Sequence, residues 1–216
     1  MKRLLAILLC TTPFPALAHP HIFVDTGVEI TMDEAGALSH VKITWTYDEY
    51  YSLLITEDLK IDQDFDGVLT DEDNALLTGF DMNWTPGFNG DLVALLDDAP
   101  LELSGPQVPT AILRNGRITT THVRQVKGTP SLAGHVLSLL AYDETYYTAY
   151  DVTLPVKIEP ASTCTLDKIA PDIDGELEQM RQMLLTINAD ADLEENEIPL
   201  IGGRFATEIR VSCPAS

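Results

Sequence analysis

Basic residues are scarce in this sequence. Lysine and arginine together number 13 against 34 aspartates and glutamates, so the formal net charge is −21 at pH 7 with histidine neutral. Such a surface repels nucleic acid and anionic membranes and concentrates cations, although acidity also serves plain solubility. We therefore expect no nucleic-acid partner and direct attention to possible cation sites.

Long hydrophobic runs and common catalytic motifs are missing too. No stretch approaches the ~20 apolar residues that a membrane-spanning helix needs, so we expect a protein that is not membrane-embedded. The chain contains no Gly-x-Ser-x-Gly, no phosphate-binding loop and no His-Glu-x-x-His. These absences exclude several familiar classes of catalytic site, and we expect a protein that is not an enzyme.

The first residues are typical of a secretory signal peptide. Lys2 and Arg3 form a basic start, residues 4–9 are apolar, and Ala16-Leu17-Ala18 provides the small residues of a cleavage site. We predict that residues 1–18 are removed on export and that residues 19–216 form a single periplasmic domain.

Cysteine is rare, with three in the chain. Cys10 lies in the predicted signal peptide, which leaves Cys164 and Cys213 as an even pair in an oxidising compartment. A disulfide between them is the expected outcome. It would close a long loop and contribute roughly 3–4 kcal/mol of stability in the chain-entropy description.

What the sequence does have is a run of alternating acids that matches the ion-binding loop of a calcium EF-hand. That loop places oxygen ligands at positions 1, 3, 5, 7, 9 and 12, with glycine at position 6 for a sharp bend. Gly67 occupies position 6. The predicted calcium ligands are Asp62, Asp64, Asp66, the Val68 carbonyl, Thr70 and Asp73. Asp73 replaces the usual glutamate and is shorter, so we expect weaker calcium binding or more tolerance of magnesium. The alternative is an acidic turn that holds no ion.

The residues around this loop favour two helices. Tyr51, Leu54, Ile55 and Leu59 recur at helical spacing before it, and Leu76, Leu77 and Phe80 follow it. Thr46 with Glu49, and Thr70 with Asp73, have the spacing of capping boxes at the two helix starts. We therefore predict an EF-hand-like helix–loop–helix over about residues 47–80.

Alternating apolar residues predict strands over most of the remaining chain. The predicted strands cover 22–30, 38–47, 111–113, 117–126, 136–141, 147–158 and 205–211, with 91–97 as a short strand or helix. An amphipathic helix is predicted over 176–187, and the acidic run 190–197 is expected to be a solvated linker. The predicted fold is α+β: a β-rich antiparallel sheet or sandwich with the inserted helix–loop–helix and a C-terminal helix.

Signal cleavage would place His19-Pro20-His21 at the new N-terminus. The free amine and ring of His19 can chelate one metal ion, and His21 adds a second imidazole. Pro20 lacks a backbone N–H, which excludes a square-planar site built on deprotonated amides. A zinc, nickel or cobalt site completed by another histidine or a carboxylate stays open, as does a copper chelate. The alternative is a frayed terminus with two solvated histidines.

Three further histidines, His40, His122 and His135, are predicted to be polar surface residues rather than ligands. In an alternative interpretation the protein is a copper enzyme, in which His19 forms the chelate and one of these three completes a T-shaped site.

Several segments, taken in order, resemble a family of periplasmic transport-associated proteins of unknown function, the DUF1007 type. They are His19-Pro20-His21, Trp45-Thr46-Tyr47-Asp48-Glu49, the loop from Asp62 to Gly67, the segment Tyr142 to Tyr147, a cysteine near each end of the last third, and the ending Arg210 to Pro214. The resemblance implies an accessory of an inner-membrane nickel/cobalt-type permease that serves zinc, nickel or cobalt. It also implies metal contacts for His19 and His21 and ion binding by Asp62, Asp64, Asp66 and Asp73. Beside the copper enzyme, a calcium-stabilised interaction module is the other alternative.

Overall fold

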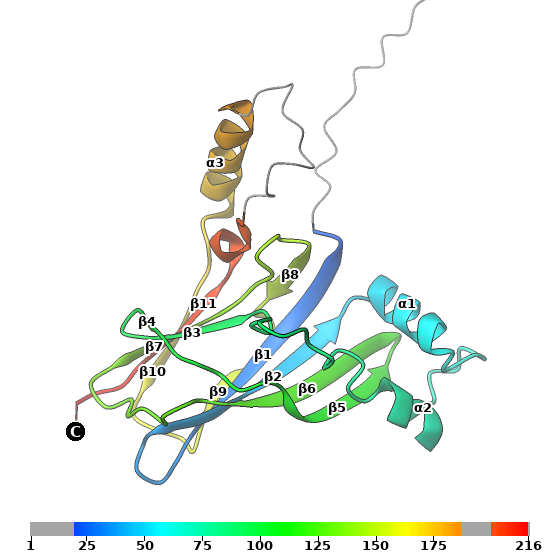
Figure 1. The fold of residues 1–216 in the computed structure, drawn as a ribbon, viewed down its shortest axis with the longest axis horizontal. Helices are drawn as coiled ribbons and strands as arrows, with labels where there is room; N and C mark the ends of the chain where they lie inside the picture. Colours follow the sequence, from blue (N-terminus) through cyan, green and yellow to red (C-terminus); the bar gives the residue numbers. More distant parts are fainter. Residues whose placement is uncertain (1–19, 187–199, 216) are drawn as a thin grey trace, which may run out of the picture.

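A computed structural model describes residues 20–186 and 200–215, which form two β-sheets with three helices (Figure 1). The predicted α+β class, the predominantly antiparallel sheets and the C-terminal helix are confirmed. His19 and the acidic run 190–197 lie outside the described residues.

The larger sheet has six strands. They are β1 (Ile22–Met32), β2 (Leu38–Tyr47), β5 (Gln107–Arg114), β6 (Arg117–Gln125), β8 (Thr148–Asp151) and β9 (Val156–Glu159). Their order is β5-β6-β2-β1, after which β8 and then β9 occupy successive stretches of the free edge of β1. Pairing is antiparallel except that β8 and β9 run parallel to β1.

The smaller sheet has five antiparallel strands in the order β10-β11-β7-β3-β4. They are β3 (Leu92–Leu96), β4 (Ala99–Pro100), β7 (Val136–Ala141), β10 (Thr165–Ile169) and β11 (Glu208–Ser212). One hydrophobic core joins the two sheets because alternate residues of each strand point inward. Fully buried members from both sheets include Ile30, Ile43, Ile118, Leu137, Leu139 and Ile209.

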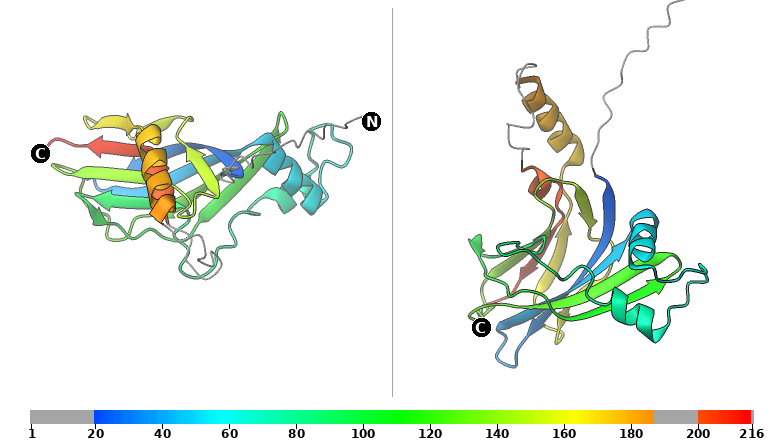
Figure 2. Two further views of the ribbon diagram at one scale, coloured as in Figure 1. Left: turned by 90° about the horizontal axis from the view of Figure 1, so that it is seen from above. Right: turned by 45° about the vertical axis from the view of Figure 1, so that its right-hand side comes forward.

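The helices lie outside the two sheets (Figures 1 and 2). They are α1 (Glu49–Leu59), α2 (Asp71–Leu77), α3 (Ile173–Thr186) and the short 3-10 helix η1 (Gly202–Phe205). Helices α1 and α2 lie between β2 and β3 in sequence, at the β5–β6 end of the larger sheet. Helix α3 projects away from the sheets beside η1, where Glu176 approaches Arg204 at 3.4 Å.

The start of α1 differs from the prediction. Thr46 stays in strand β2, where its hydroxyl hydrogen-bonds with that of Thr119, so it cannot cap the helix. Asp48 is the N-cap instead and accepts from the Tyr51 N–H at 2.8 Å. The second predicted capping box, Thr70 with Asp73, is confirmed.

The buried face of α1 is also more polar than predicted. Leu54 is exposed, while Ser52 and Thr56 are buried; Tyr51 and Ile55 are only partly buried against the core. The reason is that α1 packs on the end of β6, where a backbone N–H needs an acceptor and Ser52 provides it.

The predicted strand 147–158 is wrong as a single strand. It divides into β8 and β9, which belong to the other sheet and pair with β1. Gly27 lets the segment between β8 and β9 pass close to β1. A Cβ at this position would lie 2.9 Å from the Leu154 Cβ and 3.0 Å from the Pro155 carbonyl oxygen. Side chains at this point of β1 would push the connecting segment away.

Three other strands differ in the structure from their predicted type or bounds. Strand β5 is longer than 111–113 and passes through Pro109, which an edge strand tolerates at a register irregularity. Residues 92–96 are a strand, and the closing strand begins at Glu208 because η1 occupies residues 202–205.

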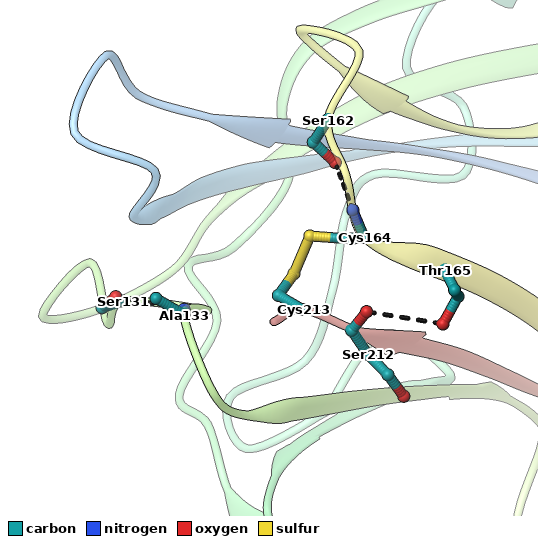
Figure 3. Close-up of a disulfide and its surroundings, with 7 residues drawn as sticks. All are labelled: Ser131, Ala133, Ser162, Cys164, Thr165, Ser212 and Cys213. Atoms are coloured by element: carbon teal, nitrogen blue, oxygen red, sulfur yellow. Dashed lines mark hydrogen bonds between the residues drawn. A yellow bond between two sulfur atoms is a disulfide. The ribbon is translucent and has the colours of Figure 1, made fainter. Parts of the chain in front are cut away.

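The predicted disulfide between Cys164 and Cys213 is present and ties β10 to the end of β11 (Figure 3). Beside it, the Thr165 hydroxyl donates to the Ser212 carbonyl. A structural disulfide is characteristic of proteins that fold in an oxidising compartment outside the cytoplasm.

Candidate metal centre

The loop between α1 and α2 brings three of the predicted calcium ligands together. Carboxylate oxygens of Asp62, Asp64 and Asp66 lie within 4.8 Å of one another. Two oxygens bound to one calcium ion are at most about 4.6–5.2 Å apart, because each Ca–O bond is about 2.3–2.6 Å. The triad therefore fits a single hard cation.

Backbone conformation and hydrogen bonds hold the loop in this shape. Asp62, Phe65 and Gly67 all have positive φ, and Gly67 reaches +74° with open space around it. The Gly67 N–H donates to Asp62 Oδ1 at 3.0 Å, and the Val68 N–H donates to Asp66 Oδ1 at 2.7 Å. The chain thus turns back on itself and keeps the carboxylates on one side.

The structure does not bring Asp73 into this triad. Its Oδ2 accepts from the backbone N–H and the hydroxyl of Thr70, at 3.1 and 2.8 Å, which closes the capping box of α2. Two predicted ligands therefore bond to each other. Asp73 would have to leave the cap to reach an ion. Val68 has a strongly exposed side chain, and its predicted role rests on its carbonyl alone.

A cavity of about 770 Å³ opens between α1, this loop and the β5–β6 turn. Asp62 and Asp66 line it from the loop, Glu49 from the helix and Arg114 from the turn. The carboxylates thus face an accessible space rather than the core, and an ion bound there would remain exchangeable.

His21 lies at the start of β1, at the same end of the larger sheet. Its backbone N–H donates to the Tyr147 carbonyl at 2.8 Å, and the two side-chain rings are 4.8 Å apart. A second cavity, of about 550 Å³, is lined by His21, Asp48, Glu49 and Arg117. Glu49 therefore lines both this cavity and the cavity beside the aspartate triad.

Asp48 and Glu49 differ in their availability as ligands. The Asp48 carboxylate already accepts from the Phe23 and Tyr51 N–H groups, at 2.9 and 2.8 Å. Glu49 stands in the first turn of α1 and lines the cavity shared with His21. Glu49 is thus the better candidate for a carboxylate that completes a histidine site.

The other histidines are not brought to His21. His40 pairs with Thr31 at the far end of β1, about ten residues away, which is roughly 30 Å along a strand. His135 precedes β7 in the other sheet, where its Nδ1 lies 2.6 Å from Asp97 Oδ2 at the surface. Neither histidine therefore lies near His21.

His122 was expected at the surface, and this expectation is wrong. Its side chain is 1% exposed because even-numbered residues of β6 face the interior. Trp45 and Trp84 meet its ring edge-on at 4.8 and 5.5 Å. Burial lowers the pKa of His122 to about 3, so the ring is neutral at physiological pH.

Sequence reasoning also missed an interior group of acids and tyrosines. The Tyr47 hydroxyl donates to Asp81 at 2.8 Å, and the Tyr150 hydroxyl donates to Asp91 at the same distance. The two residues of each pair are far apart in sequence, and the two pairs do not share a common spacing, so no sequence motif predicts them.

Together these features define a disulfide-containing α+β protein with a triad of aspartates that could hold a metal ion. Among the described residues, no helix combines the length and apolar character needed to cross a bilayer. Within this class, the chain belongs to the family described as proteins of unknown function, DUF1007, whose pattern matches residues 4–213. No curated protein sequence matches it.

Proposed function

We propose that the protein is a periplasmic metal-binding accessory of an inner-membrane permease for zinc, nickel or cobalt. In this proposal the loop from Asp62 to Asp73 holds a structural calcium ion. His19 and His21 take the transition metal and pass it on. The signal peptide predicted for residues 1–18 and the disulfide support a periplasmic location, and the family resemblance supports the role in transport.

The observation that carries the proposal is the convergence of Asp62, Asp64 and Asp66 within 4.8 Å in the helix–loop–helix. Three carboxylates at this separation repel one another in the absence of a cation, and the loop has open solvent beside it. Calcium would offset that repulsion, supply the link between α1 and α2, and hold both helices at the end of the sheet. The calcium concentration in the periplasm does not rise and fall as a signal, so we assign the ion a structural role rather than a sensing role.

Thermal unfolding with and without calcium tests the loop. Millimolar calcium should raise the melting temperature of the mature protein, and a chelator should reverse the rise; at 100 times Kd the gain is about 2.7 kcal/mol. Asp62→Ala with Asp64→Ala should abolish the shift. Glu57→Gln with Asp58→Asn is the matched control, because it removes two exposed charges of α1 that lie outside the ligand set. A wild-type protein that does not respond to calcium would refute the calcium site.

The second cavity supports the transition-metal part of the proposal. His21 and Glu49 line one space, and imidazole with carboxylate is a donor set that zinc, nickel and cobalt accept. His19, two residues earlier, would add its ring and the amine that signal cleavage releases. When bound, the metal would need an accessible site with few ligands so that it can be handed over.

Isothermal titration with zinc, nickel and cobalt tests this site. Binding should weaken in His21→Ala, in Glu49→Gln and in a form with one extra residue before His19. His40→Ala, at the other end of the sheet, should bind like wild type. Affinity should fall in acidic buffer, since protons compete with the metal ion for the imidazole nitrogens. Equal affinity in the mature and extended forms would mean that the terminal amine is not a ligand.

Two observations separate the alternatives. A copper enzyme would consume oxygen or form peroxide when loaded with copper, and the accessory would bind metal without turnover. A calcium-stabilised interaction module would retain its function when His19 and His21 are both removed. Loss of zinc, nickel or cobalt uptake by cells lacking the protein, restored by wild type and not by His21→Ala, would support the accessory role.

A further inference from the structure

The loop between α1 and α2 lies at the outer limit of the molecule, on the side away from the smaller sheet (Figures 1 and 2). The cavity of about 770 Å³ beside the aspartate triad opens there, and carboxylates form only part of its wall. Three apolar side chains line it as well, those of Leu53, Phe65 and Leu113. Its volume falls within the roughly 300–1,000 Å³ that is usual for ligand pockets.

Two of these apolar side chains are strongly exposed to solvent. Leu53 of α1 is 41% exposed, and Phe65 of the loop is 68% exposed. Phe65 also has a φ of +57°, in the left-handed region that a bulky side chain rarely adopts. The loop thus presents an aromatic ring to solvent in a backbone conformation that is itself unfavourable. A partner that covers both side chains would remove apolar surface from water.

The surroundings of this cavity are acidic. Residues 48–78 contain ten aspartates and glutamates and one basic residue. Within the described part of the chain, none of these ten acids forms an ion pair. Glu49, Asp62 and Asp66 stand in the wall itself, where Arg114 is the one basic residue among the described lining. A calcium ion would offset only two of the negative charges, so the rest attract a basic partner.

We propose that the cavity beside the aspartate triad docks a basic amphipathic segment of a partner protein. The apolar anchors of that segment pack against Leu53 and Phe65, and its lysines or arginines face the surrounding acids. Apolar anchors at helical spacing that enter a groove are a common mode of peptide recognition. Charge disfavours two other occupants, because a second copy of this chain and an anionic membrane are both negative.

The docking site also lies next to the candidate histidine site. Glu49 lines this cavity and the cavity that His21 lines. A segment docked on α1 is therefore beside the proposed transition-metal site. The inference deepens the proposed function by describing the partner's docking segment, and it rests on that function only for the identity of the partner. Binding of the segment needs no transition metal and is tested without one.

Three fluorescent synthetic peptides serve as probes. The first consists of lysine and leucine, with the leucines at helical spacing. The second keeps the lysines and has serine in place of leucine, and the third keeps the leucines and has glutamate in place of lysine. Fluorescence anisotropy with the mature protein, with calcium and with a chelator, should show saturable binding of the first peptide. The second should bind at least tenfold more weakly, and the third should not bind. Salt should weaken binding of the first, because it screens charge.

Variants of exposed residues locate the peptide. Leu53→Ala should weaken binding of the lysine–leucine peptide about fivefold, and Leu53→Ala with Phe65→Ala at least tenfold. Leu54→Ala is the matched control: Leu54 is the next residue of α1 and is 43% exposed, but it does not line the cavity. Arg114→Gln should strengthen binding, because it removes the opposing charge. These residues lie outside both proposed ligand sets, so calcium and transition-metal binding should stay as in wild type.

Several outcomes would overturn the proposal. Equal binding of the lysine–leucine and lysine–serine peptides would mean that net charge alone attracts them. Equal loss in Leu53→Ala and Leu54→Ala would place the peptide elsewhere on α1. A dimer that Leu53→Ala dissociates, detected by light scattering, would assign the cavity to a second copy, and Leu53-dependent binding to lipid vesicles would assign it to a membrane.

The docking site and the calcium site can fail separately. A calcium-dependent melting shift without peptide binding would refute the docking site alone. Peptide binding by a protein that shows no such shift would refute the calcium site alone.

Discussion

The hydroxyl of Ser52 accepts a hydrogen bond from the backbone N–H of Ile118 at 2.9 Å, and both residues are completely buried. This bond connects the first turn of α1 to the start of β6. It fixes the helix that leads into the aspartate loop, so the position of the candidate calcium site relative to the sheet depends on it.

Ser52→Ala should therefore destabilise the protein by about 1–3 kcal/mol, because the Ile118 N–H is left buried without an acceptor. Urea unfolding measures the change. Ser131→Ala is the control: its hydroxyl accepts from the Ala133 N–H at the surface, where water can replace it. Similar losses in both variants would contradict the role given to the buried bond.

Gly90 should tolerate a side chain poorly. A Cβ there would lie 2.3 Å from the Trp84 ring, and its φ of +70° is itself unfavourable for alanine. Gly90→Ala should lose about 2–5 kcal/mol from strain and overpacking together. Gly87→Ala shares the strain, with φ at +89° and open space around it, and should lose only about 1–2 kcal/mol. Calorimetry of the two variants separates the contact from the backbone effect.

Asp91 should make the protein less stable as pH rises from 4 to 7. Burial raises its pKa from 3.8 to about 6, while the Tyr150 hydroxyl opposes the rise and the charges of Asp143 and Glu144 add to it. The folded state thus binds the proton more tightly than the unfolded state. Its contribution is complete below pH 3.8 and is lost as pH passes 6.

Asp91→Asn removes this titration. Relative to wild type, the variant should gain on the order of 2–3 kcal/mol between pH 4 and pH 7, measured as the difference between their unfolding free energies. Carboxylates at the surface, such as Asp97 beside His135, have lowered pKa values and act in the opposite direction. They are present in both proteins and cancel in the difference. A constant difference across the range would contradict the prediction.

The disulfide should be a major source of stability for the C-terminal strands. Its cysteines are 49 residues apart, so it removes the freedom of a long loop from the unfolded chain. Replacing both cysteines by alanine should lower the free energy of unfolding by about 4 kcal/mol. Wild type under reducing conditions should show a similar loss. Loss in the reduced wild type but not in the alanine variant would point to a different cause.

The sequence by itself determined the features that depend on near neighbours. The alternation of apolar and polar residues predicted where β1, β2 and β6 lie in the sequence, because successive side chains of a strand point to opposite faces. The Thr70–Asp73 capping box followed from its three-residue spacing, and the clustering of Asp62, Asp64 and Asp66 follows from a tight turn. The two cysteines outside the predicted signal peptide indicated the disulfide directly.

Tertiary structure alone decided what depends on distant partners. Nothing local says that β8 and β9 run parallel to β1, since strand pairing is chosen by how the whole core packs. His122 was predicted at the surface, and only the tertiary structure shows that Trp45 and Trp84 cover the face of β6 that carries it. A cavity lined by Asp81 and Asp91 arises because segments that lie far apart in sequence, from β2 to β8, close over one space; the hydrogen bond from Tyr150 to Asp91 alone joins residues 59 apart in the chain. A motif cannot encode such a site, because its geometry exists only once the sheets have assembled.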